Sequence, residues 1–354
     1  MRKKDSSAIL SAVLAAALYG ISTPISKLLL TELPPTLLAA VLYFGAGLGM
    51  LLVNLIRRLN RQKQVEANLS RRDIPYVAAM IILDIAAPVF LMTALTNTAP
   101  ANVSLLNNFE IVATALIALA LFHETIGRRM WLAIALITLS TLILSFEDWS
   151  SLSFSAGSLF AVLACVCWGL ENNCTRKLSL KDPLQIVVIK GFGSGSGSLL
   201  IALGLRQYSF NLTYLGLALL LGFAAYGLSI YFYIRAQREL GAARTSAYYA
   251  VAPFVGVLLS MIIFDRSPSV PFLAALAIMI AGACLAAGEY HKHRHIHESI
   301  THEHRHSHDD LHHNHHHDPE VTGEHSHMHT HESLEHEHRH TPDLHHTHNH
   351  VHKP

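Results

Sequence analysis

Long apolar stretches constrain the fold of this chain more than any other feature of its sequence. The first 288 residues contain ten stretches of mainly apolar residues, each near the length of a membrane-spanning helix. A helix of about 20 residues crosses the ~30 Å hydrocarbon core of a bilayer, since each residue rises by about 1.5 Å. Only 14% of the residues are Asp, Glu, Lys or Arg, whereas soluble domains have about 25%. The sequence therefore predicts an all-α membrane protein whose ten spans run roughly over 8–30, 36–56, 74–95, 100–122, 130–146, 155–175, 184–205, 213–234, 243–264 and 270–288.

The chain also repeats part of its own sequence. The segment 10–20, LSAVLAAALYG, resembles the segment 159–169, LFAVLACVCWG, and the glycine-rich segment 44–49 recurs at 192–197. Segments that recur in the same order indicate an internal duplication. Five spans per repeat is an odd number, so the second repeat enters the membrane upside down, as in many secondary transporters. Two fused copies with a structural role are the alternative.

Three units follow from this duplication. We predict a first five-helix repeat over residues 1–147, a second over 148–290, and a tail over 291–354. The glycines of both repeats are expected to allow close helix packing.

Basic residues in the loops predict the orientation, because Lys and Arg are retained on the cytoplasmic side. With the N-terminus inside, seventeen loop residues are cytoplasmic: Arg2, Lys3, Lys4, Arg57, Arg58, Arg61, Lys63, Arg71, Arg72, Arg128, Arg129, Arg176, Lys177, Lys181, Arg235, Arg238 and Arg244. Only Lys27, Arg206 and Arg266 lie outside. We expect a multi-pass protein of the cell (inner) membrane with both termini in the cytoplasm.

The ten-span plan resembles the drug/metabolite transporter superfamily, specifically its EamA type. The resemblance rests on the Leu-Tyr-Gly and Cys-Trp-Gly junctions at 18–20 and 167–169, and on the paired segments 99–124 and 241–266. Where the family has a mid-span Glu-Pro, this chain has Glu110-Ile111 in one repeat and Ala252-Pro253 in the other. The resemblance implies a secondary transporter and, because the family carries many unrelated substrates, leaves the cargo open.

Ionisable residues within spans by default mark a transport path. Glu110 is the first candidate, because Ser104, Asn107 and Thr114 lie with it within about 120° of one face of a continuous helix. Such a polar stripe fits a water-filled cavity, or hydrogen bonding between helices.

Two further ionisable candidates have structural alternatives. Asp84 lies one turn before Pro88 and would alternatively hydrogen-bond backbone groups that the proline frees. Lys190 lies within two turns of the cytoplasmic end of its span and would alternatively extend its ammonium group to the membrane surface.

A thiol and carboxylate group on the sixth span is a candidate metal site. Cys167, Glu171 and Cys174 share a helix face, and this ligand set suits a transition metal better than a hard cation. The alternative is that the cysteines are small apolar residues. Glu171 is also our second candidate, after Glu110, for carrying a proton.

The composition changes abruptly after Glu289. Residues 291–354 hold 25 of the 26 histidines and almost no apolar residues, so we predict a disordered tail. Neutral imidazole binds divalent transition metals, and histidine-rich tracts are read as metal-binding. The candidate ligands are His291, His293, His295, His297, His302, His304, His306, His308, His312, His313, His315, His316 and His317. A pH-responsive tail without a metal is the alternative.

Three functions fit these features. The favoured one is ion-gradient-driven export of a divalent metal ion (Ni, Co or Zn) that the tail captures in the cytoplasm. The second is export of an amino acid or other small metabolite, with the tail as metal buffer or regulator. The third is a membrane-tethered metal sensor or storage protein. We expect no enzymatic activity, no catalytic cofactor and no nucleic-acid partner; membrane lipid is a partner, and a homodimer stays open.

Overall fold

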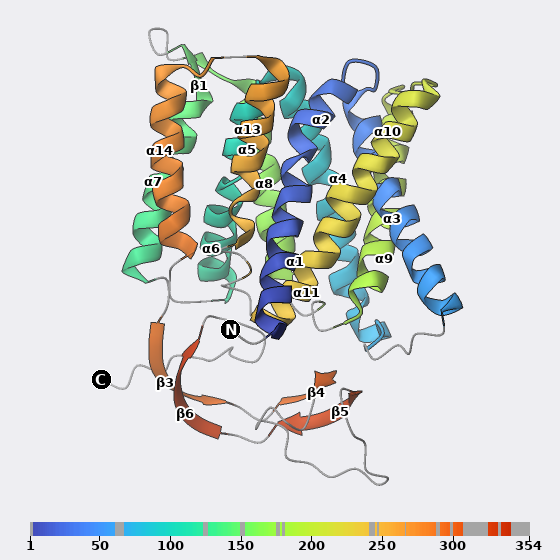
Figure 1. The fold of residues 1–354 in the computed structure, drawn as a ribbon, viewed down its shortest axis with the longest axis vertical. Helices are drawn as coiled ribbons and strands as arrows, with labels where there is room; N and C mark the ends of the chain where they lie inside the picture. The colour runs from blue at the N-terminus through green and yellow to red at the C-terminus, as the bar shows by residue number, and fades with distance from the viewer. Residues whose placement is uncertain are drawn as a thin grey trace.

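The computed structural model describes most of the helical region and four segments of the tail. The described residues are 3–60, 67–122, 127–148, 153–174, 178, 181–240, 245, 248–265, 267–287, 291–297, 300–306, 325–331 and 334–340. The helices are α1 (Lys3–Gly20), α2 (Ser22–Leu29), α3 (Pro35–Leu59), η1 (Arg71–Asp73), α4 (Ile74–Asn97), α5 (Pro100–Leu106), α6 (Phe109–Phe122), α7 (Arg128–Ser145), α8 (Ala156–Cys174), α9 (Pro183–Gly204), α10 (Leu212–Gly222), η3 (Phe223–Leu228), α11 (Ser229–Leu240), α13 (Ala252–Phe264) and α14 (Val270–Ala287). α1 begins, and α14 ends, at the end of the bundle where the tail strands lie (Figure 1).

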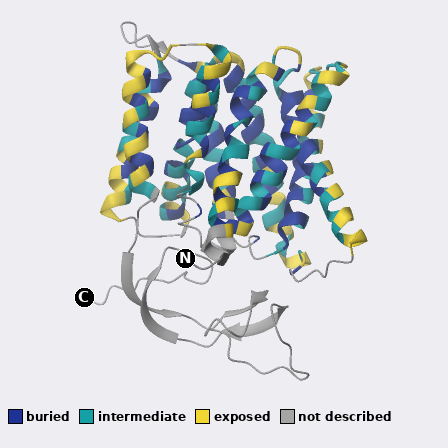
Figure 2. Ribbon diagram, viewed as in Figure 1, coloured by how far each residue is buried: buried dark blue, intermediate teal, exposed yellow. Residues whose placement is uncertain are grey.

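The predicted membrane class is confirmed by the length and composition of these helices. Among the described residues, seven helical segments are long and apolar enough to cross a membrane, and two shorter apolar helices cover Ala252–Phe264 and Val270–Ala286. α8, with 19 residues, occupies the sixth predicted span. Buried residues lie between the helices, and much of the outward surface is exposed (Figure 2). Exposed side chains such as Leu10, Leu52 and Leu200 suit contact with lipid.

Helix packing follows the duplication. The second span packs on the seventh, through α3 and α9, and the fifth packs on the tenth, through α7 and α14. The third span packs on the sixth, through α4 and α8, just as the first packs on the eighth, through α1 and α11. Spans one to five correspond to spans six to ten, so every contact in this set has an equivalent contact in the same set. This is the pattern expected for five-helix repeats related by an approximate two-fold axis.

Glycines at equivalent positions of the two repeats contact equivalent spans. A methyl group added at Gly49 of α3 would meet the ring of Phe223 on the eighth span, and one added at Gly197 of α9 would meet Ile85 on the third. The absence of a side chain lets both pairs of helices approach closely. The predicted packing role of the glycine-rich segments is confirmed.

Gly45→Ala is expected to lower the free energy of unfolding by about 1–3 kcal/mol, the usual range for overpacking. The added methyl group would meet the backbone of Leu219 on α10, which cannot rotate away. Thermal unfolding in detergent measures the effect. Gly216→Ala, on the same α10, is the control, because nothing lies within 4 Å of its new methyl group. Equal unfolding temperatures for the two variants would contradict close packing at Gly45.

The fourth and eighth spans depart from a regular α-helix, whereas the sequence predicts continuous helices. The fourth turns at Asn107 and Asn108 between α5 and α6, whereas the first continues through Ile21, whose N–H still bonds to the Ala17 oxygen. In the eighth span, η3 is a π-helical segment. Pro88, by contrast, lies inside the continuous α4. In membranes such interruptions are tolerated where protein or water satisfies the freed backbone groups.

The strands are short and lie outside the bundle. β1 (Phe146–Asp148) pairs with β2 (Ser153–Phe154), β3 (His291–His297) with β6 (Leu334–His340), and β4 (Ile300–His306) with β5 (His325–His331). The described tail segments are thus extended and paired. Each tail sheet has two strands, and an isolated two-stranded sheet is at best marginally stable.

Candidate functional site

Three charged side chains meet inside the bundle, and we call them the charge cluster. They are Asp84 of α4, Glu171 of α8 and Lys190 of α9. The Lys190 ammonium lies 2.9 Å from Asp84 Oδ2 and 3.3 Å from Glu171 Oε1. The Tyr43 hydroxyl donates a 3.0 Å hydrogen bond to Asp84 Oδ1. One cation is therefore shared by two carboxylates that come from different repeats.

The cluster is buried. Asp84, Glu171 and Lys190 are 0%, 7% and 8% exposed. Lys190 follows Pro183 by seven residues and Asp84 follows Ile74 by ten, so they lie about 10 and 15 Å along their helices at 1.5 Å per residue. The alternative that Lys190 extends to the membrane surface is excluded by this burial, and its place in a transport path stays a prediction. The long side chain can instead reach two carboxylates, which offset the cost of burying its charge.

Close helix packing brings the cluster together. Lys190 precedes Gly191, and a methyl group on Gly191 would meet the backbone of Gly47 and Tyr43 on α3. α4 in turn packs on both α8 and α9. Asp84 thus pairs with side chains of neighbouring helices, and no hydrogen bond from Asp84 to the backbone near Pro88 is present among the described contacts. If both carboxylates are ionised, the cluster has a formal charge of −1.

Glu110 belongs to a second polar group, beside the charge cluster. The side-chain amide of Asn172 donates to Glu110 Oε1 at 2.7 Å and to Thr114 Oγ1 at 3.4 Å. Asn173 donates to the backbone oxygen of Thr114 at 3.0 Å. Glu110 is partly exposed and Asn172 is exposed. The fourth and sixth spans are thus joined through a carboxylate that remains accessible.

The predicted polar stripe of the fourth span is wrong in one respect, because the turn at Asn107 and Asn108 divides it. Glu110 and Thr114 face Asn172 on α8, whereas the Ser104 hydroxyl lies beside Gly256 of α13. The Cys165 thiol contacts the backbone oxygens of Leu106 and Asn107 at 3.6 and 3.7 Å. The turn therefore redirects the stripe toward two different spans.

Aromatic side chains of the helix bundle form a group that our sequence analysis did not predict. We call Tyr19, Trp168, Tyr226 and Tyr249 the aromatic cluster. The ring centroid of Tyr19 lies 6.3 Å from that of Trp168, 6.1 Å from Tyr226 and 5.7 Å from Tyr249. The Tyr226 hydroxyl accepts a hydrogen bond from Ser22 at 3.3 Å. The signal was present in the duplication, since Tyr19 and Trp168 occupy equivalent positions of the two repeats.

Of the candidate metal ligands of the membrane region, the structure describes the side chains of Cys167 and Glu171. Among the described residues, no group of three or more His, Cys, Asp or Glu side chains is arranged to hold a metal. Glu171 pairs with Lys190, and the side chain of Cys174 lies outside the described residues. Cys167 is a partly exposed free thiol. A shared ammonium group beside Glu171 disfavours a cationic metal there, because like charges repel.

In the tail, the strand register places histidines opposite histidines. In β3 and β6 the pairs are His291 with His340, His293 with His338 and His295 with His336. In β4 and β5 they are His302 with His329, His304 with His327 and His306 with His325. His308, His312, His313, His315, His316 and His317 lie outside the described residues. Metal binding by the tail stays a prediction.

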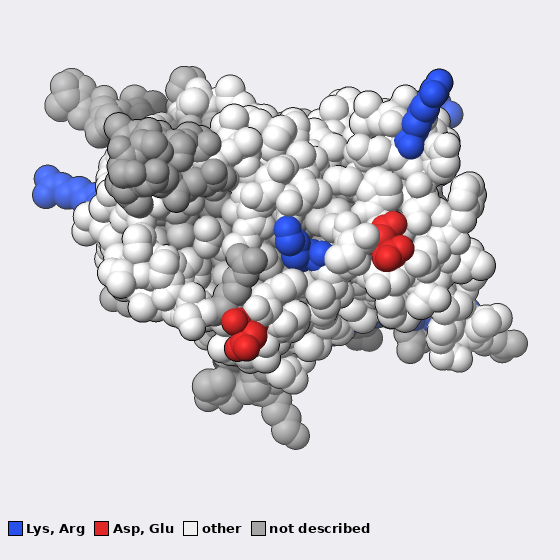
Figure 3. Space-filling view, turned by 90° about the horizontal axis from the view of Figure 1, so that it is seen from above, with Lys and Arg blue, Asp and Glu red and all other residues white. Residues whose placement is uncertain are grey.

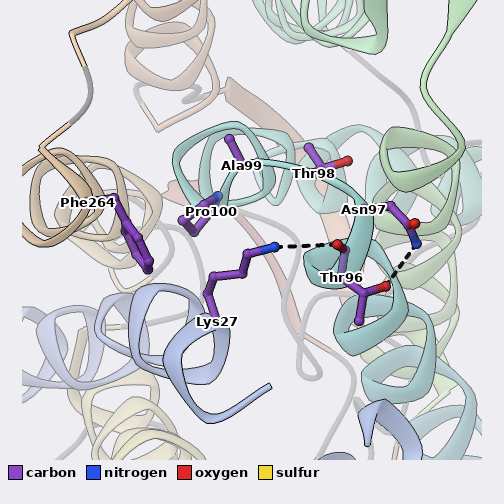
Figure 4. A pocket seen from close by; sticks show the side chains of 7 residues that line it. All are labelled: Lys27, Thr96, Asn97, Thr98, Ala99, Pro100 and Phe264. Carbon is purple, nitrogen blue, oxygen red and sulfur yellow. Dashed lines mark hydrogen bonds between the residues drawn. The ribbon is translucent and has the colours of Figure 1, made fainter. Parts of the chain in front are cut away.

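A pocket of about 230 Å³ lies at the end of the bundle away from the tail. Lys27 points toward the Thr96 backbone oxygen, and Pro100 and Phe264 lie beside it (Figure 4). The Lys27 ammonium donates to the backbone oxygens of Leu95 and Thr96, near the C-terminal end of α4, where carbonyls lack helical partners. Lys27 thus joins the first and third spans. Figure 3 shows this face from above, with few charged side chains on a mainly uncharged surface.

Known proteins share this architecture. A family model described as "EamA-like transporter family" matches residues 6–146 and 155–288. An uncharacterized transporter of Methanothermobacter thermautotrophicus is 25% identical over 289 residues, which cover 77% of this chain and 84% of the relative. The uncharacterized transporter YyaM of Bacillus subtilis is 23% identical over 256 residues, or 69% of this chain and 82% of the relative. A solved crystal structure has a similar fold, with a TM-score of 0.57 and 19% identity over 79% of this chain and 96% of that one.

Proposed function

This chain belongs to the EamA-like transporter family, and from that premise we propose that it is an ion-gradient-driven exporter of a small charged organic solute. The observation that carries the proposal is the charge cluster, in which Lys190 bridges Asp84 and Glu171 across three helices. Buried ionisable groups at membrane depth are costly, and they typically belong to ion or substrate paths. We propose no enzymatic activity and no catalytic cofactor.

The charge cluster supplies a physical basis for coupling. Lys190 is held by two carboxylates, so a proton that binds either of them weakens one ion pair and frees the ammonium group to favour the other. Asp84 belongs to the first repeat, and Glu171 and Lys190 to the second. Because the repeats move against one another in alternating access, a change of partner would alter the contacts between them. Proton binding at the cluster would thereby favour one arrangement of the repeats over the other.

Metal export is the second candidate, and the histidine-rich tail favours it. The histidine-rich tail indicates a metal ligand, since imidazole binds divalent transition metals. Organic cargo ranks first because the described part of the membrane region has no group of metal ligands, whereas it does contain charged, polar and aromatic side chains from both repeats. With organic cargo, the tail would act as a metal buffer or regulator.

A cargo screen separates the two candidates. Full-length protein in sealed vesicles, with an imposed proton gradient, would be offered a panel of amino acids, small amines and the ions of Ni, Co and Zn. The proposal predicts accumulation of one organic class and none of the metal ions, relative to vesicles without protein. Accumulation of a metal ion alone would contradict it and favour the second candidate.

The proposed orientation has both termini in the cytoplasm of a cell with an inner membrane. The proposal is supported by the distribution of basic loop residues, of which seventeen are predicted on the cytoplasmic side and three on the other. A reporter fused after Pro354 should be active only if it requires the cytoplasm. A second fusion in the loop after Ser145 should behave in the opposite way. Activity of the first fusion on the outer side would contradict the orientation.

A further inference from the structure

We propose that Arg57 and Arg235 bind the phosphate of an anionic phospholipid, at the end of the bundle where the tail strands lie. Arg57 is on α3 of the first repeat, and Arg235 is on α11 of the second. Three observations carry the inference: two guanidinium groups at one tyrosine ring, no carboxylate paired with either of them in the described structure, and a position at the edge of the apolar surface. The inference does not depend on the cargo.

Tyr231 of α11 holds the two guanidinium groups close together. The Arg57 guanidinium donates a 2.6 Å hydrogen bond to the Tyr231 hydroxyl, and its Cζ lies 5.4 Å from the ring centroid. The Cζ of Arg235 lies 5.8 Å from the same centroid. An aromatic ring attracts a cation within about 6 Å, and Tyr231 is 7% exposed. A buried ring therefore positions two positive charges that come from different repeats.

These two positive charges are not neutralised within the described part of the chain. No ion pair of Arg57 or Arg235 with a carboxylate is present there, whereas Lys181 and Lys190 are both paired. A guanidinium group has five N–H donors, and Arg57 donates one of them to Tyr231. Two like charges held at one ring repel each other. An anion that binds both arginines would relieve this repulsion and use their remaining donors.

The last turns of α3 indicate the depth of this site in the membrane. Leu55, Ile56 and Leu59 are exposed there, which suits contact with hydrocarbon. Arg57 lies among them in the sequence, and α3 ends at Leu59. In Figure 1, α3 and α11 both end on the side of the tail and diverge toward it. The arginines thus lie near the level where apolar surface ends, and basic residues at this level attract anionic lipids.

A phospholipid fits the two guanidinium groups better than other anions do. The planar guanidinium donates two parallel hydrogen bonds to phosphate oxygens, which a point charge cannot match. The acyl chains add contacts with exposed apolar side chains at the same level, and free phosphate lacks them. A zwitterionic lipid would bring its own cation toward two arginines, so the anionic class is favoured. A bound headgroup would bridge α3 and α11, and with them the two repeats.

Native mass spectrometry of the full-length protein measures lipid binding without cargo or gradient. At pH 8 the tail histidines are neutral and do not attract anions. Wild-type protein should bind phosphatidylglycerol at least about fivefold more tightly than phosphatidylcholine with the same acyl chains. Arg57→Gln and Arg235→Gln should each weaken phosphatidylglycerol binding by about fivefold, the usual effect of one basic residue near an anionic membrane. Binding of phosphatidylcholine should not change.

Arg128→Gln is the matched control, because Arg128 is an exposed arginine at the start of α7 without a ring contact among the described residues. It should bind phosphatidylglycerol as wild type does. Arg235→Gln keeps the hydrogen bond between Arg57 and Tyr231, which guards against loss of folding as the cause of weaker binding. Thermal unfolding of each variant without lipid checks this directly.

Equal affinity of wild-type protein for the two lipids would overturn the inference, as would equal phosphatidylglycerol binding by wild type, Arg57→Gln and Arg235→Gln. Excess inorganic phosphate should not displace the lipid, and displacement would assign the site to free phosphate instead. The outcome is separate from that of the proposed function. Lipid binding without transport in the cargo screen would refute the transporter proposal alone, and transport without a preference for phosphatidylglycerol would refute this inference alone.

Discussion

Lys190→Gln is expected to abolish gradient-driven transport and to lower the free energy of unfolding by about 3–5 kcal/mol. The substitution removes the cation that Asp84 and Glu171 share and leaves two carboxylates buried without it. Breaking a buried ion pair from one side is costly, because the remaining charge keeps its desolvation penalty. Thermal unfolding in detergent and uptake into vesicles measure the two effects.

Lys181→Gln is the matched control. Lys181 lies 3.9 Å from Asp73 in a looser, partly exposed ion pair near the start of α9, and such pairs contribute at most about 1 kcal/mol. Adding Asp84→Asn to Lys190→Gln should recover part of the lost stability without restoring transport, because one unpaired charge is removed and coupling stays broken. Equal unfolding temperatures for the Lys190 and Lys181 variants would contradict a stabilising role of the charge cluster.

Truncation after Tyr290 is expected to remove nearly all high-occupancy metal binding while leaving the unfolding temperature of the bundle unchanged. The tail holds 25 of the 26 histidines and contributes almost no apolar surface, so its loss should not expose a core. Metal bound per protein, after equilibration with Ni or Zn and desalting, measures the first effect. Because imidazole must be neutral to bind a metal, binding by the full-length protein should fall below about pH 6.5.

A tail in which the histidines are replaced by asparagine is the control for length and polarity. This variant should also lose metal and keep its stability. If organic cargo is correct, both variants should still transport it in vesicles without metal. Retention of full metal binding by the truncated protein would instead place the metal site in the membrane region.

The helical fold was readable from the sequence because hydrophobic length and repetition are local signals. Apolar runs of span length predicted the helices, and the glycines at equivalent positions predicted close packing. The turn in the fourth span was not readable, since Asn107 and Asn108 look like members of a polar stripe. Whether such residues continue a helix depends on the tertiary contacts that satisfy the freed backbone.

The candidate site was predicted residue by residue but not as an arrangement. The sequence singled out Asp84, Glu171 and Lys190 separately, because a charge within an apolar span is conspicuous. Their meeting depends on how α4, α8 and α9 pack, and no sequence spacing encodes that. The sequence also left open that Lys190 extends to the membrane surface, because its two buried carboxylate partners are visible only in the structure.

The aromatic cluster was not predicted from the sequence, for a different reason. Tyrosine and tryptophan are common in membrane helices, so Tyr226 and Tyr249 carried no distinguishing signal in the sequence. Only Tyr19 and Trp168 did, through their equivalent positions in the repeats. Contact between equivalent residues, at a centroid distance of 6.3 Å, follows when both lie near the axis that relates the repeats.

The most direct test of coupling at the charge cluster is proton movement driven by cargo. Wild-type protein would be sealed in vesicles with an internal pH-sensitive dye and given the solute identified in the cargo screen. The account predicts a change of internal pH that requires the solute, and loss of that change in Asp84→Asn and in Lys190→Gln but not in Lys181→Gln. Cargo transport that leaves the internal pH unchanged and is insensitive to a protonophore would contradict proton coupling at Asp84, Glu171 and Lys190.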